Sequence, residues 1–256
     1  MKKIALVLVI VMMLAMLTGC GSDKGVTLKD IQKAGELVVA TSPDFPPFEN
    51  LENGEVVGIE IDLLNIICEK MGKELVIEQM NFDSVLPGVQ AGKYDVGMSG
   101  ITITEARQKN ADFTQPYFLA SQAIVVMADS DIATKADLTG KKISVQTGTT
   151  AEEYCMENGY EVLAFQANND ACEALTTGKV QAWVVDNEVA LDLSAKTNGA
   201  TKVLDEAMTS EPYGFAFAKG STLVSDIDKL IGKWLADGTI EGIFNKYEVP
   251  FVNPVK

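Results

Sequence analysis

Histidine is absent from this chain of 256 residues. Its absence removes the side chain most used as a general base near neutral pH and the usual ligand of zinc. Basic residues are also few, with 21 Lys and Arg against 36 Asp and Glu, and the formal net charge is −15. A chain this acidic is a poor partner for nucleic acid or for anionic lipid surfaces. We therefore predict no nucleic-acid binding, no metal site and no catalytic residue.

Cysteine is scarce as well, with four in the whole sequence. Beyond Cys20, the three that remain are Cys68, Cys155 and Cys172, and none of them is spaced as CxxC. Zinc and redox motifs are therefore excluded, and we predict no cofactor. Small fillers of the core or surface are the favoured interpretation of these thiols, since free cysteine is commonly buried. A disulfide between Cys155 and Cys172 stays open as the alternative.

Long apolar runs are missing except at the amino terminus. Lys2-Lys3 precede an apolar run, Ile4 to Leu17, whose 14 residues fall short of the ~20 that span a bilayer. A basic start followed by a short apolar run is typical of a secretion signal. The next residues, ending in Thr18-Gly19-Cys20, resemble the bacterial lipobox. An ordinary signal with a chance cysteine is the alternative.

The lipobox resemblance implies a specific processing of the chain. Residues 1–19 would be a lipoprotein signal peptide, Cys20 would carry the acyl chains, and residues 20–25 would be a polar tether. Stable anchoring takes about two acyl chains, which a diacylglyceryl group supplies. We therefore expect an extracytoplasmic protein that contacts the cell membrane through its lipid anchor alone.

Strand and helix patterns alternate along the rest of the chain, whose hydrophobic content of 47% fits a packed core. This alternation predicts an α/β fold with mostly parallel sheets, in which ligands bind beyond the carboxyl ends of the strands. The predicted strands of the first part are Glu36–Ala40, Val56–Ile61, Leu75–Gln79 and Val96–Met98, and its helices are Leu63–Met71, with Asp62 as the cap, and Phe82–Gln90.

The stretch Ser99 to Arg107 joins a strand end to a predicted helix start. Gly100 lets the backbone approach another group closely, because glycine has no Cβ. Thr104 followed by Glu105 is typical of a helix start, which places Arg107 in the first turn. A guanidinium beside helix amides suits a small carboxylate. The alternative is an ordinary strand-to-helix turn with an arginine on the surface.

A second α/β series begins with the predicted strand Ser121–Met127. Further along, Thr149 and Thr150 offer free amides at the start of a predicted helix, Ala151–Asn158. Asp186 follows the predicted strand Val180–Val185 and so lies at the carboxyl edge of the sheet. The alternative role for Asp186 is a helix cap.

Several segments together resemble the solute-binding proteins of family 3, which serve importers of polar amino acids. They occur in the order of that family and cover nearly the whole chain after the signal. The segments are Ala40–Glu49, Gly58–Leu63, Phe82–Pro87, Gly100–Arg107, Asp112–Thr114 with Pro116-Tyr117, Gln146–Thr150 and Glu211–Lys219.

The resemblance implies a two-lobed fold like that of the type II periplasmic binding proteins. Lobe 1 would comprise residues 26–118 and 212–256, and lobe 2 residues 122–208. The chain would cross between the lobes near Leu119–Ser121 and Thr209–Glu211, and the lobes would close on ligand like a hinge.

The resemblance also implies a binding set for an amino acid. Arg107 and the amides beside Thr102, Thr149 and Thr150 would take its carboxylate. Asp186, the Ser99 or Gly100 carbonyl and the Thr102 hydroxyl would take its ammonium. Phe45 and Phe82 would flank the side chain, and Ser42 and Asp44 would lie near its tip. Family members with basic ligands often carry an acid at the position of Ser42, so a neutral polar amino acid is favoured, while Asp44 and Glu49 keep basic ligands open.

The implied function is that of the extracytoplasmic binding component of an ABC amino-acid importer. Its partners would be the free amino acid, a permease and the permease's ATPase, and the protein would be a monomer and not an enzyme. One alternative is a cyclohexadienyl dehydratase on the same scaffold, with Glu60, Asp44 or Glu49 as the acid. Two others are the sensing part of a receptor, against which the end of the chain at Lys256 speaks, and a structural lipoprotein without ligand.

Overall fold

The structure is a computed structural model and describes residues 35–255. The predicted signal peptide, the lipidated Cys20 and the tether lie outside the described residues. Within residues 35–255, none of the helices combines the length and the apolar character needed to cross a bilayer.

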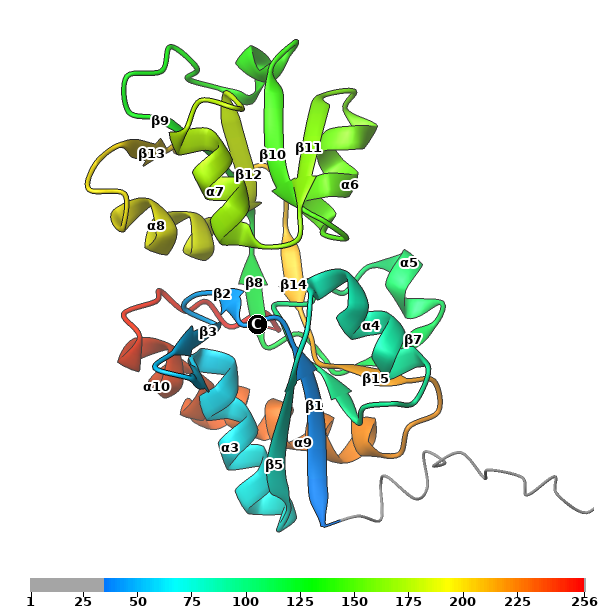
Figure 1. The fold of residues 1–256 in the computed structure, drawn as a ribbon. Coiled ribbons are helices and arrows are strands. Elements are labelled where there is room, and N and C mark those ends of the chain that lie inside the picture. The colour runs from blue at the N-terminus through cyan, green and yellow to red at the C-terminus, as the bar shows by residue number, and fades with distance from the viewer. Residues whose placement is uncertain (1–34, 256) are drawn as a thin grey trace, which may run out of the picture.

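The elements gather in two lobes, the lower and the upper in Figure 1. The lower lobe holds a sheet of order β5-β1-β6-β15-β7, in which β5, β1 and β6 are parallel and β15 is antiparallel to both of its neighbours. Its strands are β1 (Glu36–Thr41), β5 (Glu74–Gln79), β6 (Val96–Gly97), β7 (Ala111–Phe113) and β15 (Ala216–Ala218), and a small sheet adds β2 (Asp44–Phe45), β3 (Glu49–Glu52) and β4 (Glu55–Val57). Its helices are α3 (Ile59–Met71), α4 (Phe82–Gln90), α5 (Glu105–Gln108), α9 (Leu223–Asp237) and α10 (Thr239–Lys246).

The upper lobe holds a second sheet, of order β11-β10-β12-β9-β13. Strands β11, β10 and β12 are parallel, and β9 runs antiparallel to β12 and β13. The strands are β9 (Gln122–Met127), β10 (Lys142–Gln146), β11 (Glu161–Phe165), β12 (Ala182–Asp186) and β13 (Thr201–Val203), and the helices are η1 (Lys135–Leu138), α6 (Thr150–Glu157), α7 (Asn168–Thr176) and α8 (Asn187–Ala195).

Each face of the upper sheet is buried by different helices. Ala123 and Val125 of β9 belong to the same apolar cluster as residues of α7 and α8. Their neighbours Ile124 and Val126 instead belong to a cluster that includes Ala151 of α6. Successive side chains of a strand point to opposite faces. The continuous apolar runs of these strands are therefore those of a sheet covered on both sides.

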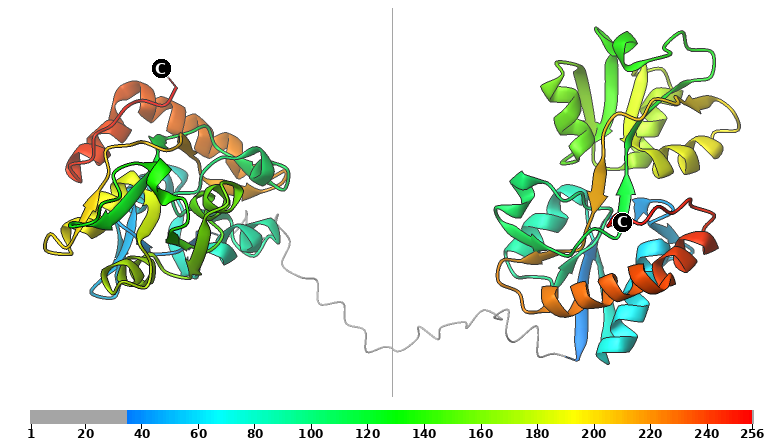
Figure 2. Two further views of the ribbon diagram at one scale, coloured as in Figure 1. Left: turned by 90° about the horizontal axis from the view of Figure 1, so that it is seen from above. Right: turned by 180° about the vertical axis from the view of Figure 1, so that it is seen from behind.

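Two short antiparallel strands connect the lobes, β8 (Phe118–Ala120) and β14 (Glu211–Tyr213). They run between the lobes in both the front and the rear view (Figures 1 and 2). Gln122, which begins β9, pairs with Asp186, which ends β12. The carboxyl ends of the parallel strands of the upper lobe thus lie next to the crossings and face the lower lobe. The exact limits of the lobes stay a prediction.

The predicted strand Val56–Ile61 is wrong in its second half. Strand β4 ends at Val57, and helix α3 begins at Ile59. Gly58 breaks the strand with a φ of 139°, and a Cβ there would overlap the carbonyl group of Phe48. Gly58, not Asp62, is therefore the N-cap of the helix, and Glu60 lies in its first turn.

The possible disulfide is also wrong. Cys68, Cys155 and Cys172 are free thiols, and all three are buried. Burial raises the pKa of the Cys155 thiol to about 12. A buried thiol that stays protonated is inert as a nucleophile, so these residues act as core fillers.

Candidate functional site

Arg107, the only arginine of the sequence, is held by the local structure that its neighbours form. Helix α5 begins as predicted at Thr104, whose hydroxyl accepts a hydrogen bond from the Arg107 amide at 3.2 Å. The guanidinium donates from Nη1 to the Thr102 carbonyl at 3.0 Å and lies 5.7 Å from the centre of the Phe82 ring. Burial lowers the pKa of Arg107, and Glu153 and Glu211 oppose that effect. The side chain stays cationic, since a guanidinium does not lose its proton in proteins.

Asp186 ends β12 and occupies the N-cap position of α8, yet its side chain makes no capping hydrogen bond. Its carboxylate instead accepts hydrogen bonds from the Gln122 amide group and the Tyr213 hydroxyl. The residue is 6% exposed. Burial raises the pKa of Asp186 to about 8. A buried carboxyl of this kind gains from a cationic partner placed beside it.

Arg107 of the lower lobe and Asp186 of the upper lobe line one pocket, which holds about 230 Å³ of empty space. No ion pair joins them among the described residues. The pocket therefore carries a cation and an anion with room between them. The predicted site residues that also line it are Phe45, Phe82, Ser99, Gly100, Thr102, Thr149 and Thr150.

The backbone turn of this pocket needs glycine at position 100. Gly100 has a φ of 54°, in the left-handed region that other residues enter only with strain. A Cβ at Gly100 would also overlap the Phe45 ring. The predicted close approach of this backbone to a neighbouring group is confirmed, and the neighbour is an aromatic ring of the site itself.

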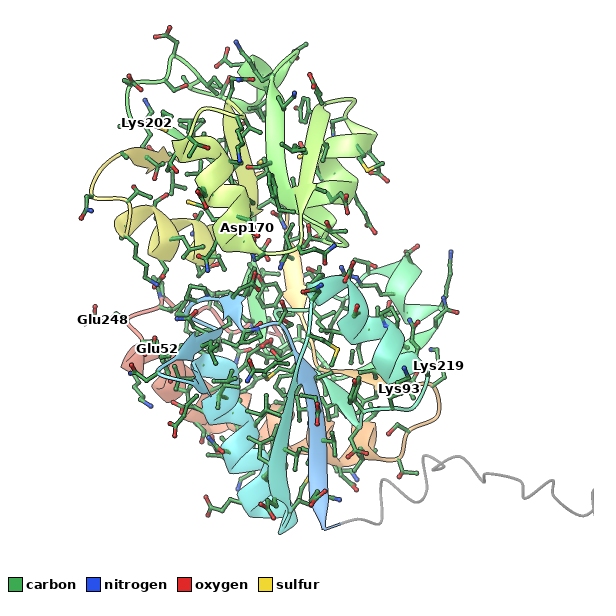
Figure 3. All side chains as sticks on the ribbon, in the orientation of Figure 1. Glu52, Lys93, Asp170, Lys202, Lys219 and Glu248 are labelled. Atoms are coloured by element: carbon green, nitrogen blue, oxygen red, sulfur yellow. The ribbon has the colours of Figure 1, made fainter. Side chains whose placement is uncertain are left out.

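Ser42 and Asp44 lie outside this pocket's lining, and Asp44 links the two lobes instead. Its carboxylate accepts hydrogen bonds from the Asn168 backbone amide at 2.7 Å and from the Gln146 side chain at 3.1 Å. The Ser42 hydroxyl donates to the same carboxylate at 3.0 Å. Asn168 is the first residue of α7, and Figure 3 shows Asp170 of this helix at the end that faces the lower lobe. The N-cap residue of α7, Ala167, offers no side-chain cap, so Asp44 provides one across the lobes.

We expect Asp44→Ala to weaken ligand binding by about tenfold, because N-terminal capping by an oxygen contributes roughly 1 kcal/mol. This contact exists only when the lobes are close, so its loss favours the open state. Isothermal titration calorimetry with several amino acids would measure the effect. A similar loss for every ligand is expected. A loss confined to basic amino acids would contradict the lobe-linking role and show that Asp44 contacts the ligand side chain.

Four residues that support the site were not predicted: Gln122, Gln146, Asn168 and Tyr213. Gln146 and Tyr213 stand in segments that carry the family resemblance, so their positions gave a signal that residue types alone did not. Gln122 opens a strand and Asn168 opens a helix, and nothing in their local sequence distinguishes them from surface amides.

Two buried oxygens of these residues have no hydrogen-bond partner among the described residues, Gln122 Oε1 and Asn168 Oδ1. Both residues line a second small pocket that shares Phe45, Gln146 and Asp186 with the first. An unpaired buried acceptor is costly, and it gains when a donor reaches it. The second pocket thus suits a group that donates hydrogen bonds.

The sequence profile of the bacterial extracellular solute-binding proteins, family 3, matches residues 37–250. Among curated proteins, a probable histidine-binding protein of Campylobacter jejuni is 31% identical over 219 residues, which are 83% of this chain and 85% of that protein. The L-cystine-binding protein TcyJ of Escherichia coli is 30% identical over 232 residues, which are 88% of this chain and 87% of that protein. Among solved structures, an ancestral arginine-binding protein bound to glutamine is 41% identical with a TM-score of 0.80, and the match covers 84% of this chain and 98% of that one.

Proposed function

The chain belongs to the bacterial extracellular solute-binding proteins, family 3, and from this premise we propose that it captures a free polar L-amino acid for an ABC importer. The ligand binds between the two lobes and is delivered to a membrane permease. The two-lobed fold of type II periplasmic binding proteins, expected from the sequence, is confirmed by the similarity to solved structures.

One observation carries this proposal: Arg107 and Asp186 face one pocket from opposite lobes without contacting each other. An amino acid is a zwitterion, so it needs a cation for its carboxylate and an anion for its ammonium. Because each charge comes from a different lobe, a ligand that touches both gains its full contacts only in the closed state. That difference in contacts is what a ligand needs to shift the lobes toward closure.

In our proposal the Arg107 guanidinium, with the amides at Thr102 and Thr150, holds the ligand carboxylate. Asp186, the Ser99 carbonyl and the Thr102 hydroxyl hold its ammonium. The Phe82 ring lies under the guanidinium and orients it, a role different from the flanking position expected from the resemblance. The ligand side chain extends toward Gln146 and Asn168.

The unpaired oxygens of Gln122 and Asn168 select for a side chain that donates hydrogen bonds. We expect L-arginine, L-glutamine or L-histidine to raise the melting temperature, and L-glutamate and L-aspartate to fail at the same concentration. A side-chain carboxylate would face acceptors and Asp44, and an unpaired buried charge is strongly disfavoured. A thermal-shift screen of single amino acids measures this. Stabilisation by L-glutamate above that by L-glutamine would contradict the proposed selectivity.

The function itself is tested by mass spectrometry of small molecules released from the purified protein on unfolding. An amino acid among them, with thermal stabilisation by the same compound, is the expected result. A protein that no amino acid stabilises would contradict the proposal and favour a structural lipoprotein.

The cellular setting is the outer side of the cell membrane. We propose that residues 1–19 are removed, that Cys20 carries acyl chains, and that the monomeric protein contacts a permease whose ATPase drives transport. Intact-mass measurement of the protein extracted from membranes, compared with Cys20→Ala, tests the anchor.

The family and the relatives described above are binding proteins, and the alternative of a dehydratase receives no support from them. Of the acids considered for that chemistry, Glu49 and Glu60 are fully buried and line neither pocket. A general acid must reach the proton acceptor of its substrate directly or through one water. We therefore propose binding without catalysis.

A further inference from the structure

Two carboxylic acids, Glu49 and Glu60, lie behind the pocket, and both are 0% exposed. Neither forms an ion pair within the described part of the chain. Buried carboxyls without a cationic partner destabilise a fold. Their retention at this place therefore calls for a contribution other than stability.

Both acids hold the same backbone turn. Glu49 Oε1 accepts a hydrogen bond from the Ser99 hydroxyl at 2.7 Å. Each carboxyl oxygen of Glu60 lies 3.2 Å from the Gly100 amide nitrogen, which donates to them. The Tyr117 hydroxyl donates to Glu60 as well. The turn that lines the pocket at Ser99 and Gly100 is thus fixed from behind by two acids.

The charge resides on Glu60. Burial, and next to it the neighbouring Glu60, raises the pKa of Glu49 well above its ordinary value, so Glu49 keeps its proton at neutral pH. Burial raises the pKa of Glu60 to about 7, and hydrogen bonds from Glu49 and the Gly100 amide oppose that effect. The donors directed at Glu60 favour its ionised form.

The geometry of a trans peptide decides where the other end of this peptide points. The N–H and C=O of one peptide unit lie in a plane and point in opposite directions. Because the Gly100 N–H points at Glu60, the Ser99 carbonyl points away from Glu60, toward the pocket that Ser99 and Gly100 line. A negative charge behind the N–H polarises the peptide and makes this carbonyl a stronger acceptor.

We propose that Glu60 is a positioning residue for the ligand's ammonium group, acting through the Ser99–Gly100 peptide, with Glu49 fixing the same turn through the Ser99 hydroxyl. The inference rests on the proposed function. The ammonium then meets Asp186 from the upper lobe and a carbonyl strengthened by Glu60 from the lower lobe. A neutral group in the place of the ammonium gains nothing from this arrangement.

The test compares two ligands on Glu60→Gln, which keeps the size of the side chain and removes its charge. One ligand is whichever of L-arginine, L-glutamine, L-histidine and L-cystine binds the wild-type protein most tightly. The other is its desamino analogue, in which hydrogen replaces the ammonium. We expect Kd for the amino acid to rise about tenfold or more, as for the loss of a charge-assisted contact. Kd for the analogue is expected to change much less.

Asp95→Asn is the matched control. Asp95 is also a buried carboxyl of the lower lobe, 2% exposed, and accepts a hydrogen bond from a backbone amide, that of Val38, at 2.9 Å. It precedes β6 and so lies at the edge of the sheet opposite the pocket. Its substitution is expected to change the melting temperature and to leave both Kd values unchanged. Should Glu60→Gln fail to fold, Glu60→Asp, which withdraws the carboxylate from Gly100, is expected to show the same preference.

An equal loss for both ligands would overturn the inference, because it would mean that Glu60 only supports the fold of the site. An unchanged Kd for the amino acid in a folded Glu60→Gln protein would overturn it too. Failure of the wild-type protein to bind any of the four amino acids would instead overturn the proposed function, and this inference with it.

Discussion

Replacing Arg107 by alanine is expected to weaken amino-acid binding by about 2–4 kcal/mol, as for truncating one member of a buried, hydrogen-bonded charge pair. The ligand carboxylate would be left in the closed cleft without its cation. Arg107 also donates from Nη2 to the Gly148 carbonyl of the upper lobe at 3.1 Å, so its loss removes a contact between the lobes as well. Isothermal titration calorimetry of the two proteins measures the effect.

Two further variants sharpen this test. Arg107→Lys keeps the charge and loses the planar fork that pairs with a carboxylate, so it is expected to recover only part of the affinity. Lys109→Ala removes an exposed cation two residues away and is expected to bind as the wild type does. A folded Arg107→Ala protein that binds within a factor of a few of wild type would refute the assignment.

The sequence was informative wherever chemistry is local. The start of α5 at Thr104 follows from a hydroxyl that meets an amide three residues away. The special conformation of Gly100 follows from a residue without Cβ at a strand end. Asp186 could be placed at the carboxyl edge because β12 ends there. Periodicity and capping rules act over a few residues, so one sequence suffices to apply them.

Contacts between distant segments could not be predicted in this way. Asp44 and Asn168 are 124 positions apart, and Gln122 and Asp186 are 64 apart. Their meeting depends on how two separately wound lobes face each other. The boundary at Gly58 was missed for a different reason, since Ile59 and Ile61 alternate like strand residues although both lie in α3. An apolar pair with one residue between fits either structure in so short a window.

Asp186→Ala should weaken amino-acid binding by a similar amount, about 2–4 kcal/mol, because the ligand ammonium would lose its anion. Asp186 also makes binding depend on pH. Without ligand, burial raises its pKa to about 8, with Glu211 and Glu188 adding to the rise and Tyr213 and Arg107 opposing it. The ammonium of a ligand favours the ionised carboxylate, so binding below about pH 8 should release a proton. Affinity should therefore rise with pH up to about 8.

The fold responds to the same group with the opposite sign. A carboxyl whose pKa is about 8 when folded and 3.8 in its unperturbed state stabilises the unliganded protein fully below the lower value, and this stability is lost as pH rises toward 8. Asp186→Asn should abolish both dependences, whereas Asp170→Asn, an exposed acid of α7, should keep them. Calorimetry in two buffers of different ionisation enthalpy counts the protons released. If the wild type released no proton at pH 6.5, a carboxylate already ionised before ligand arrives would have to replace this account of Asp186.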